Sequence, residues 1–343
     1  MGKDMQSRRD FLRHAVMLAG AGVTAPLWAA MKYDKNAVLR HFRAGAAATD
    51  ARVKAGIEAN RKGDMTLLFT DAQGRPCENV HVKVRQLRHD FKYGANLFGL
   101  SETKNGAESA AAYRERFAAA FNFATLPFYW QANEPEPGKY RFAKDSPYMY
   151  RRPPIDLCLE FCEANGIEPK VQAHAVWGAN MKRVASLARF QYNPQFTFDL
   201  LDTYAKLGKP IQITECTIPA CSEDPGDEAV QAEIVRNLYR IWFSHKAMEA
   251  IIYWDLSDAY TWQPKVFGSF LRRDMSPKPS YNVICDLFGR EWRTNFDRDA
   301  PGGRLSFRGF CGTYEVEATS NGRTVKRQFH VGREKLRSMG IMI

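Results

Sequence analysis

The order of strand-like and helical segments in the middle of the chain most constrains its fold. Short apolar runs typical of buried strands occur at 91–98, 121–130, 168–177, 210–218 and 250–256. Stretches with helical periodicity lie between them, at 108–120, 154–165, 195–207 and 227–247. This alternation predicts βα units arranged around a parallel sheet.

Both ends of the chain have a different pattern. Residues 34–62 are charged and alanine-rich, which predicts a helix, and "MTLLFTDAQGRPCENVHVKVRQLRHDF" then alternates on both sides of a Gly/Pro turn. Near the other end, "FRGFCGTYEVEATSNGRTVKRQFHV" alternates around "SNGR", a strong hairpin signal. We therefore expect a small β-sandwich-like accessory region built from 31–90 and 291–343, with 65–90 as the packing partner of the C-terminal strands.

The first residues resemble a twin-arginine export signal. Arg8 and Arg9 precede a short apolar run rich in Ala and Gly that ends in small residues. The run is too short and too weakly apolar to span a bilayer. We expect residues 1–30 to be a signal peptide and the mature protein to be periplasmic or secreted, free of the membrane; a merely basic, frayed N-terminus is the alternative.

Charge and cysteine content exclude few classes of function. The formal net charge of +11 is spread along the chain, and no basic helix or nucleic-acid module accompanies it, so we expect no nucleic-acid partner. An anionic polysaccharide is compatible with this charge. The chain has 7 cysteines; Cys158 and Cys162 have helical spacing and should face a core, while a Cys216–Cys221 disulfide stays open. Without CxxC or HExxH, we expect no metal site and no cofactor.

Several predicted strands end in residues that suit carbohydrate binding. In βα barrels the active site lies at the carboxyl ends of the strands. Sugars offer apolar ring faces to aromatic side chains and hydroxyl groups to carboxylates, imidazoles and indole N–H groups. The residues at these ends are Tyr129, Trp130, His174, Trp177, Glu215, Trp254, Asp258 and Trp262.

These motifs give the chain a family resemblance. "AHAVW", "GKPIQITE" and "YWDLSDAYTW", followed by "PKPSYNVI", resemble the family 10 glycoside hydrolases, chiefly endo-1,4-β-xylanases. The resemblance covers about residues 91–290. It implies a (β/α)8 TIM-barrel type of fold that hydrolyses β-1,4-linked xylan or a related plant polysaccharide.

The resemblance also implies roles for individual residues. Glu215, in the ITE strand, matches the nucleophile, and His174 matches the histidine that holds the sugar beside the scissile bond. Trp254 and Trp262 match tryptophans that wall this subsite, and Asp258 matches a supporting aspartate. Two further substrate-binding candidates are Trp177 and Tyr129; Tyr129 stands where the family has a sugar-gripping lysine within an "ENxMKW" motif that is otherwise missing here.

The chain departs from the family at the second catalytic group. A retaining glycosidase needs a nucleophilic carboxylate and a protonated carboxyl group about 5–5.5 Å away. The family's acid/base glutamate lies in a "WDVVNE"-like strand, but between His174 and Glu215 the only acidic residues are Asp199 and Asp202, on a predicted outer helix. The strand that would carry this glutamate is missing, together with the two strands after it, so strands four to six of the barrel are absent. At 30 or more residues per βαβ unit, this loss amounts to about 100 residues.

No other acid is a convincing replacement. Glu134 and Glu136 follow the second strand, and Glu102 follows the first. We therefore expect a retaining hydrolase with Glu215 as nucleophile and with doubtful activity. The alternatives are a non-catalytic polysaccharide-binding remnant of the same fold and an internally deleted version of an ordinary enzyme; the oligomeric state stays open.

Overall fold

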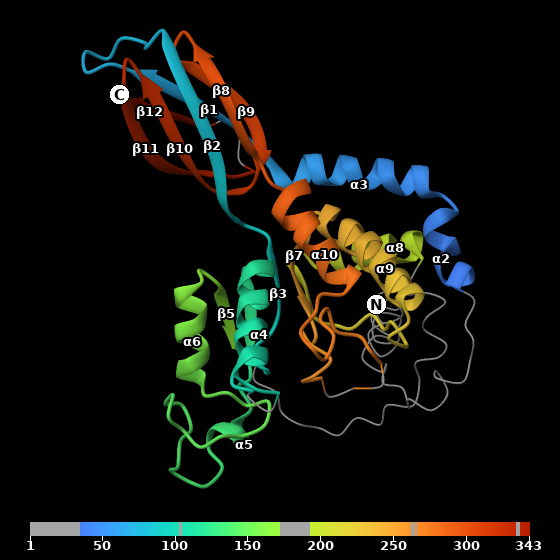
Figure 1. Cartoon of the computed structure of the whole chain (residues 1–343). Helices are drawn as coiled ribbons and strands as arrows, with labels where there is room; N and C mark the ends of the chain where they lie inside the picture. Colours follow the sequence, from blue (N-terminus) through green and yellow to red (C-terminus); the bar gives the residue numbers. More distant parts are fainter. Residues whose placement is uncertain (1–34, 103–104, 172–192, 262–263, 265, 334–336) are drawn as a thin grey trace, which may run out of the picture.

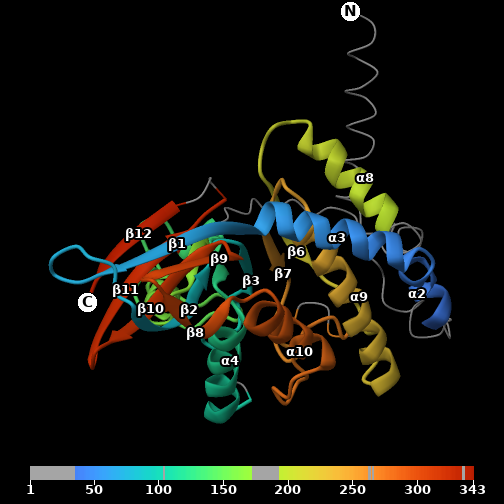
Figure 2. The same cartoon turned by 90° about the horizontal axis from the view of Figure 1, so that it is seen from above.

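A computed structural model describes residues 35–102, 105–171, 193–261, 264, 266–333 and 337–343. Two structural units make up this part of the chain (Figures 1 and 2). The first, called the parallel-sheet unit, contains residues 35–61 and 91–292. The second, called the β unit, contains residues 62–89 and 295–342. The predicted signal at 1–30 lies outside the described residues.

The parallel-sheet unit is built on five parallel strands. Each overlaps a segment that the apolar pattern predicts to be a strand, and their order in the sheet is β5-β4-β3-β7-β6. The strands are β3 (Lys92–Asn96), β4 (Phe123–Leu126), β5 (Glu168–Val171), β6 (Ile211–Cys216) and β7 (Met248–Tyr253). Among the described residues, no further strand pairs with β5 or β6, so these two form the edges of the sheet. Five parallel strands with helices between them agree with the predicted incomplete (β/α)8 arrangement.

Helices follow the strands, as expected for βα units. They are α4 (Ala107–Ala120), the short α5 (Trp130–Asn133), α6 (Ile155–Ala164), α8 (Pro194–Ala205), α9 (Pro225–Ser244), α10 (Pro279–Asp286) and the π-helical turn η1 (Leu287–Glu291). Two of them begin at side-chain caps followed by proline: the Asn193 side chain accepts a hydrogen bond from the Phe196 amide, and that of Asp224 accepts one from the Gly226 amide.

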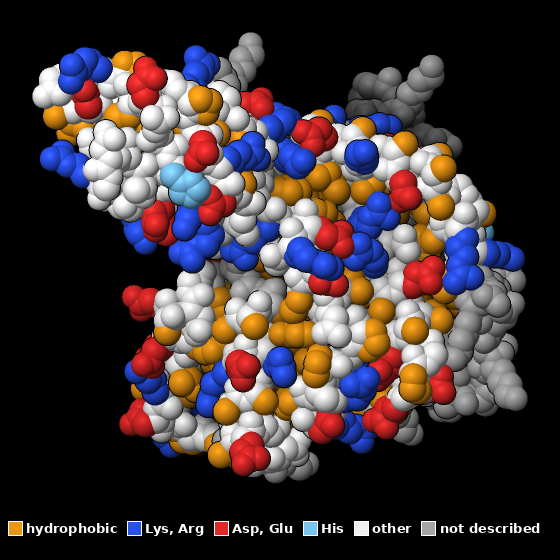
Figure 3. Space-filling model, turned by 45° about the horizontal axis from the view of Figure 1, so that its top comes forward, with side chains coloured by type: hydrophobic (Ala, Val, Ile, Leu, Met, Phe, Trp, Pro, Cys, Tyr) orange, Lys and Arg blue, Asp and Glu red, His pale blue; other side chains and the backbone are white. Residues whose placement is uncertain are grey.

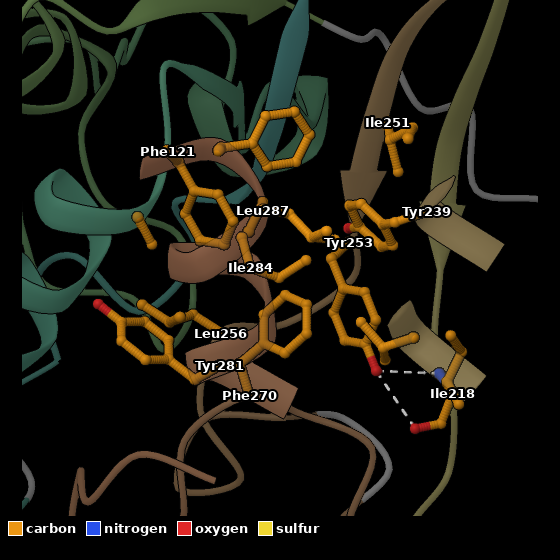
Figure 4. Packing of buried hydrophobic residues seen from close by; sticks show 14 of the residues in the cluster. Phe121, Ile218, Tyr239, Ile251, Tyr253, Leu256, Phe270, Tyr281, Ile284 and Leu287 are labelled. Carbon is orange, nitrogen blue, oxygen red and sulfur yellow. Dashed lines mark hydrogen bonds between the residues drawn. The ribbon is translucent and has the colours of Figure 1, made fainter. Parts of the chain in front are cut away.

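The core of the parallel-sheet unit lies between the sheet and these helices (Figure 4). Tyr253, at the end of β7, is fully buried, and its hydroxyl donates to the Gly268 carbonyl oxygen at 2.6 Å. The same hydroxyl accepts a hydrogen bond from the Ile218 amide at 3.1 Å. The phenol therefore joins the loops after β6 and β7 at the end of the sheet where the predicted site residues lie.

The predicted N-terminal helix is two helices, α2 (Lys35–Arg43) and α3 (Ala46–Arg61), separated at Gly45, whose φ of 105° is left-handed. Both contact α9. Phe42 and Val53 belong to the core of the parallel-sheet unit, and Arg52 pairs with Asp202 of α8 at 2.8 Å. The helical part of the region 31–90 therefore packs on the parallel-sheet unit, whereas its strands belong to the β unit.

The β unit combines strands from both ends of the chain into two sheets. β1 (Lys62–Thr70) lies between β12 (Arg337–Met342) and β9 (Arg304–Phe310). The second sheet has the order β11-β10-β2-β8 and contains β2 (Asn79–His89), β8 (Asn295–Pro301), β10 (Gly312–Ser320) and β11 (Arg323–Val331). Leu67, Val82 and Tyr314, from both sheets, share one buried core. The "SNGR" turn joins β10 to β11 with positive φ at Asn321 and Gly322, as that signal predicts.

The described cysteines are free thiols, and the surface charges in Figure 3 are mixed in sign. Cys158 and Cys162 are buried as predicted, whereas Cys216 and Cys221 are free thiols, so the disulfide left open from the sequence is not formed. Within the described residues, no helix is both long and apolar enough to cross a bilayer. On the face shown in Figure 3, Lys and Arg side chains are interspersed with Asp and Glu over both units, so that face carries no continuous basic stripe.

Candidate active site

Three of the predicted site residues lie at the carboxyl end of the parallel sheet. Glu215 is the exposed penultimate residue of β6, Tyr129 follows β4, and Trp254 follows β7. The carboxyl ends of parallel strands open on one side of a sheet, where α/β proteins bind ligands. We call this region the site mouth. His174, Trp177 and Trp262 lie outside the described residues.

An arginine covers one face of Tyr129. The guanidinium carbon of Arg152 lies 3.8 Å from the Tyr129 ring centroid, a cation–π contact, and the Phe98 ring lies 5.8 Å away, edge-on. Burial raises the pKa of Tyr129; the nearby positive charge of Arg152 opposes this shift, and the negative charge of Glu215 adds to it. Tyr129 is therefore influenced by a cation stacked on its ring and by the charge of the predicted nucleophile.

Trp254 is largely buried. Its exposed fraction is 9%, and its ring meets that of Phe98 edge-on at a centroid distance of 5.3 Å. Its backbone amide donates to the Cys216 carbonyl oxygen at 2.7 Å, which ties the end of β7 to the residue after Glu215. Trp254 therefore offers only a small part of its indole for stacking on a ligand.

Asp258 is buried in the loop after β7. Its Oδ2 lies 2.5 Å from Nζ of Lys278, whose side chain is fully buried, and its Oδ1 accepts from the Ser269 amide at 3.0 Å. Lys278 also donates to the Phe267 carbonyl oxygen at 2.9 Å. Asp258 therefore supports the loops around the mouth through an internal ion pair.

Sequence reasoning missed a buried ion pair beneath the mouth. Nη2 of Arg151 lies 2.9 Å from Oδ1 of Asp255, and both side chains are less than one-tenth exposed. Asp255 also accepts hydrogen bonds from Asn96 at 3.2 Å and from Thr261 at 2.8 Å. Arg151 has φ 57° and Asp255 has φ 64°, both in the left-handed region that non-glycine residues avoid. Such backbone persists only where the surroundings hold it, commonly at functional sites.

Glu102 anchors the other side of Arg151. It is fully buried, and its carboxylate accepts from the Tyr148 hydroxyl at 2.8 Å and from the Arg151 amide at 2.6 Å. Burial raises the pKa of Tyr148 to about 12, and the hydrogen bond to Glu102 adds to this shift. The motif "SPYMYRRPP" at 146–154 is the only sequence signal for this cluster, since adjacent arginines before two prolines are unusual for a loop.

The remaining acids considered from the sequence have other partners. Glu134 accepts from the Gly138 amide at 2.9 Å, and Glu136 pairs with Lys139 at 2.6 Å. Asp199 and Asp202 lie on α8, as predicted, where Asp202 pairs with Arg52 and His245. The segment 172–192, outside the described residues, contains no Asp or Glu in its sequence.

Comparison with known proteins tests the predicted resemblance. The model of glycosyl hydrolase family 10 matches residues 171–287, from the end of β5 to the first residue of η1. The predicted resemblance to family 10 glycoside hydrolases is confirmed. The matched family 10 segment is shorter than the predicted 91–290, so it contains Glu215, Trp254 and Asp258, whereas Tyr129 and Arg151 precede it.

Two curated relatives match parts of the chain. The anti-sigma-I factor RsgI6 of Acetivibrio thermocellus is 32% identical over 125 residues, which cover 36% of this chain and 16% of that protein. Endo-1,4-beta-xylanase B of Thermotoga neapolitana is 31% identical over 94 residues, 25% of this chain and 27% of that enzyme. The matches thus span about a quarter or less of each relative's length.

Among solved structures, native xylanase 10B from Thermotoga maritima aligns with 59% of this chain and 96% of its own, at 17% identity and a TM-score of 0.41.

Proposed function

We propose that this chain binds a β-1,4-linked plant polysaccharide, with xylan as the first choice, through a site of the family 10 glycoside hydrolase type, and that it cleaves this substrate very slowly. The match of residues 171–287 to family 10 supports the substrate class and the nucleophilic role of Glu215. The expected signal at 1–30 extends the proposal to a periplasmic or secreted location. Replacing Arg8 and Arg9 by lysine should then retain the precursor in the cytoplasm.

The expectation of very slow cleavage rests on the partners of the carboxylates around the mouth. In the retaining mechanism, Glu215 attacks the anomeric carbon while a protonated carboxyl group gives its proton to the leaving oxygen. Around the mouth, Asp255 is paired with Arg151, Asp258 with Lys278, and Glu102 accepts two hydrogen bonds in a buried site. Each of these carboxylates is buried and already bonded to protein groups, so it is poorly placed to donate a proton to a bound sugar. Loss of general-acid assistance typically lowers a rate by about 10²–10⁴-fold.

An activated substrate separates nucleophilic attack from proton donation. The dinitrophenyl glycoside of xylobiose has a leaving group that departs without a proton. We expect this compound to form a covalent ester on Glu215 that intact-protein mass spectrometry detects, while polymeric xylan releases very little reducing sugar. Glu215→Gln should form no ester, and Glu115→Gln, an exposed glutamate on α4, should behave like the wild type.

The second candidate is a binding protein without chemistry, which the same carboxylate partners favour. In that case xylan retards the protein in affinity electrophoresis, Glu215→Ala leaves this retardation unchanged, and no ester forms. Ester formation on Glu215 would exclude this candidate. Absence of both retardation and ester would exclude both candidates.

A further inference from the structure

One cation at the site mouth, Arg152, has a hydrogen-bonding edge that no described residue uses. Nη1 of Arg152 donates to the Arg151 carbonyl oxygen at 2.8 Å. Its Nε and Nη2 make no hydrogen bond to any residue that the structure describes, and no carboxylate in that part of the chain pairs with it. Arg151, by contrast, has its own carboxylate partner in Asp255.

The neighbouring residues fix the position of this guanidinium. One face of it lies on the Tyr129 ring at 3.8 Å, and the Phe98 centroid is 5.3 Å away. The backbone beneath it is held because the Arg151 amide donates to Glu102 and the Arg151 side chain bonds Asp255 and the Tyr260 carbonyl oxygen. Arg152 is therefore preorganised, which lowers the entropy lost when it binds a ligand.

The free edge selects for one chemical group. The Nε and Nη2 hydrogens of a guanidinium lie parallel in one plane and match the two oxygens of a carboxylate. Burial lowers the pKa of Arg152; Tyr129 opposes this shift and the charge of Arg151 adds to it, so a bound anion would offset part of the cost of desolvating this cation. Arg152 stacks on Tyr129, and Tyr129 and Glu215 both lie at the carboxyl end of the parallel sheet, so a sugar held at Arg152 lies at the site mouth.

We propose that Arg152 is the carboxylate-binding residue of this site and that the polysaccharide it selects carries uronic acid residues. This inference rests on the proposed polysaccharide-binding function and goes beyond it by naming the charged group that is recognised. The net charge of +11 agrees with an anionic polymer, although it is too dispersed to specify one.

Binding to a matched pair of polymers tests this inference. The probes are glucuronic acid-substituted xylan and the same xylan after chemical reduction of its carboxyl groups to alcohols, each measured by affinity electrophoresis and calorimetry. We expect the wild type to bind the acidic polymer about tenfold more tightly at low salt, because a charge-assisted fork is strong when partly buried. We also expect added salt to reduce this ratio.

The variants distinguish recognition from a structural role. Arg152→Gln should bring the ratio close to one while leaving affinity for the reduced polymer unchanged, which also shows that the site is folded. Arg152→Lys keeps the charge but loses the fork, so its ratio should be intermediate. Arg290→Gln, an exposed arginine on η1, is the control and should retain the full ratio.

Each remaining outcome has a separate meaning. Equal binding of both polymers by the wild type, or a full ratio in Arg152→Gln, overturns the role of Arg152 and leaves the polysaccharide function standing. Failure of the wild type to bind either polymer overturns the proposed function, and the inference falls with it.

Discussion

The two units of this protein bury their strands in different ways. In the β unit, β10 alternates strictly between buried and half-buried residues, and β2 alternates between buried and exposed residues as far as Gln86, as expected when one face of a sheet meets a core. In the parallel-sheet unit, the inner strand β4 is buried at every position, while the edge strands β5 and β6 contain no buried residue. In the β unit, the two sheets therefore cover each other's inner faces. The parallel-sheet unit instead relies on helices and on internal polar contacts near its open edges.

The largest expected effect comes from breaking the internal ion pair of the parallel-sheet unit. Lys278→Met removes the cation 2.5 Å from Asp258 and leaves a buried carboxylate without a counterion. We expect the free energy of unfolding to fall by about 3–5 kcal/mol. No tryptophan occurs at 62–89 or 295–343, so tryptophan fluorescence in urea reports this unit and should show the loss. A change below about 1 kcal/mol would mean that solvent reaches the pair.

A matched change in the β unit should act on that unit alone. Leu67→Ala removes a fully buried side chain from β1, and we expect a loss of about 3 kcal/mol. Amide hydrogen exchange in β2 and β10 should rise, while the tryptophan transition stays in place. The control is Leu68→Ala, because the neighbouring residue on the same strand is 36% exposed and faces away from the core. Simultaneous loss of the tryptophan transition would show that the two units unfold together.

Lowering the pH should destabilise the junction of the two units, because His89 is buried there. This residue ends β2 and packs against the rings of Phe243, Phe288 and Phe310. Burial, with smaller effects from two nearby arginines, lowers the pKa of His89 to about 3, although a hydrogen bond with the Trp292 backbone opposes the shift.

The sign of the pH effect follows from this depressed pKa. Between about pH 6.5 and pH 3 the unfolded chain binds a proton at His89 that the folded chain does not, so stability falls as the pH falls. We expect a loss of roughly 1.4 kcal/mol per pH unit, about 2–3 kcal/mol between pH 6 and pH 4. Urea titrations at several pH values should show a shallower slope for His89→Phe, with a residual slope from His245, whose pKa burial also lowers. An unchanged slope in His89→Phe contradicts the assignment.

Local signals in the sequence predicted local structure well. The "SNGR" turn could be recognised because Asn321 and Gly322 tolerate the left-handed backbone that a tight hairpin requires. The strands and helices of the parallel-sheet unit followed from their periodicity. Glu215 could be placed at the end of a strand from its short motif, as the structure shows, whereas its catalytic role stays a prediction.

Partners far apart in the sequence could not be predicted. β1 and β2 are separated by one turn, yet they lie in different sheets, since β1 pairs with β12 and β9 while β2 pairs with β10 and β8. A turn predicts a reversal of the chain and says nothing about which strand is the neighbour. The Arg151–Asp255 pair joins two loops, and a charged residue in a loop is expected at the surface unless its partner is known.

The smallest predicted effect concerns the open edges of the parallel sheet. Nζ of Lys170, on β5, donates to Oε1 of Gln212 on β6 at 2.8 Å, and Gln212 in turn donates to Glu249 at 2.8 Å. The two edge strands are therefore joined by side chains without being paired by their backbones. Burial lowers the pKa of Lys170, and the charge of Glu249 opposes the shift.

Lys170→Met should weaken this link by about 1 kcal/mol, the usual net value of one such hydrogen bond. Because the contact lies at the edges, we expect faster amide exchange in β5 and β6 while the urea midpoint of the whole unit moves little. Lys206→Met, an exposed lysine just after α8, should leave both strands unchanged. If exchange in β5 is the same in both variants, backbone pairing to β4 alone holds that edge, and the open sheet needs no side-chain link across its gap.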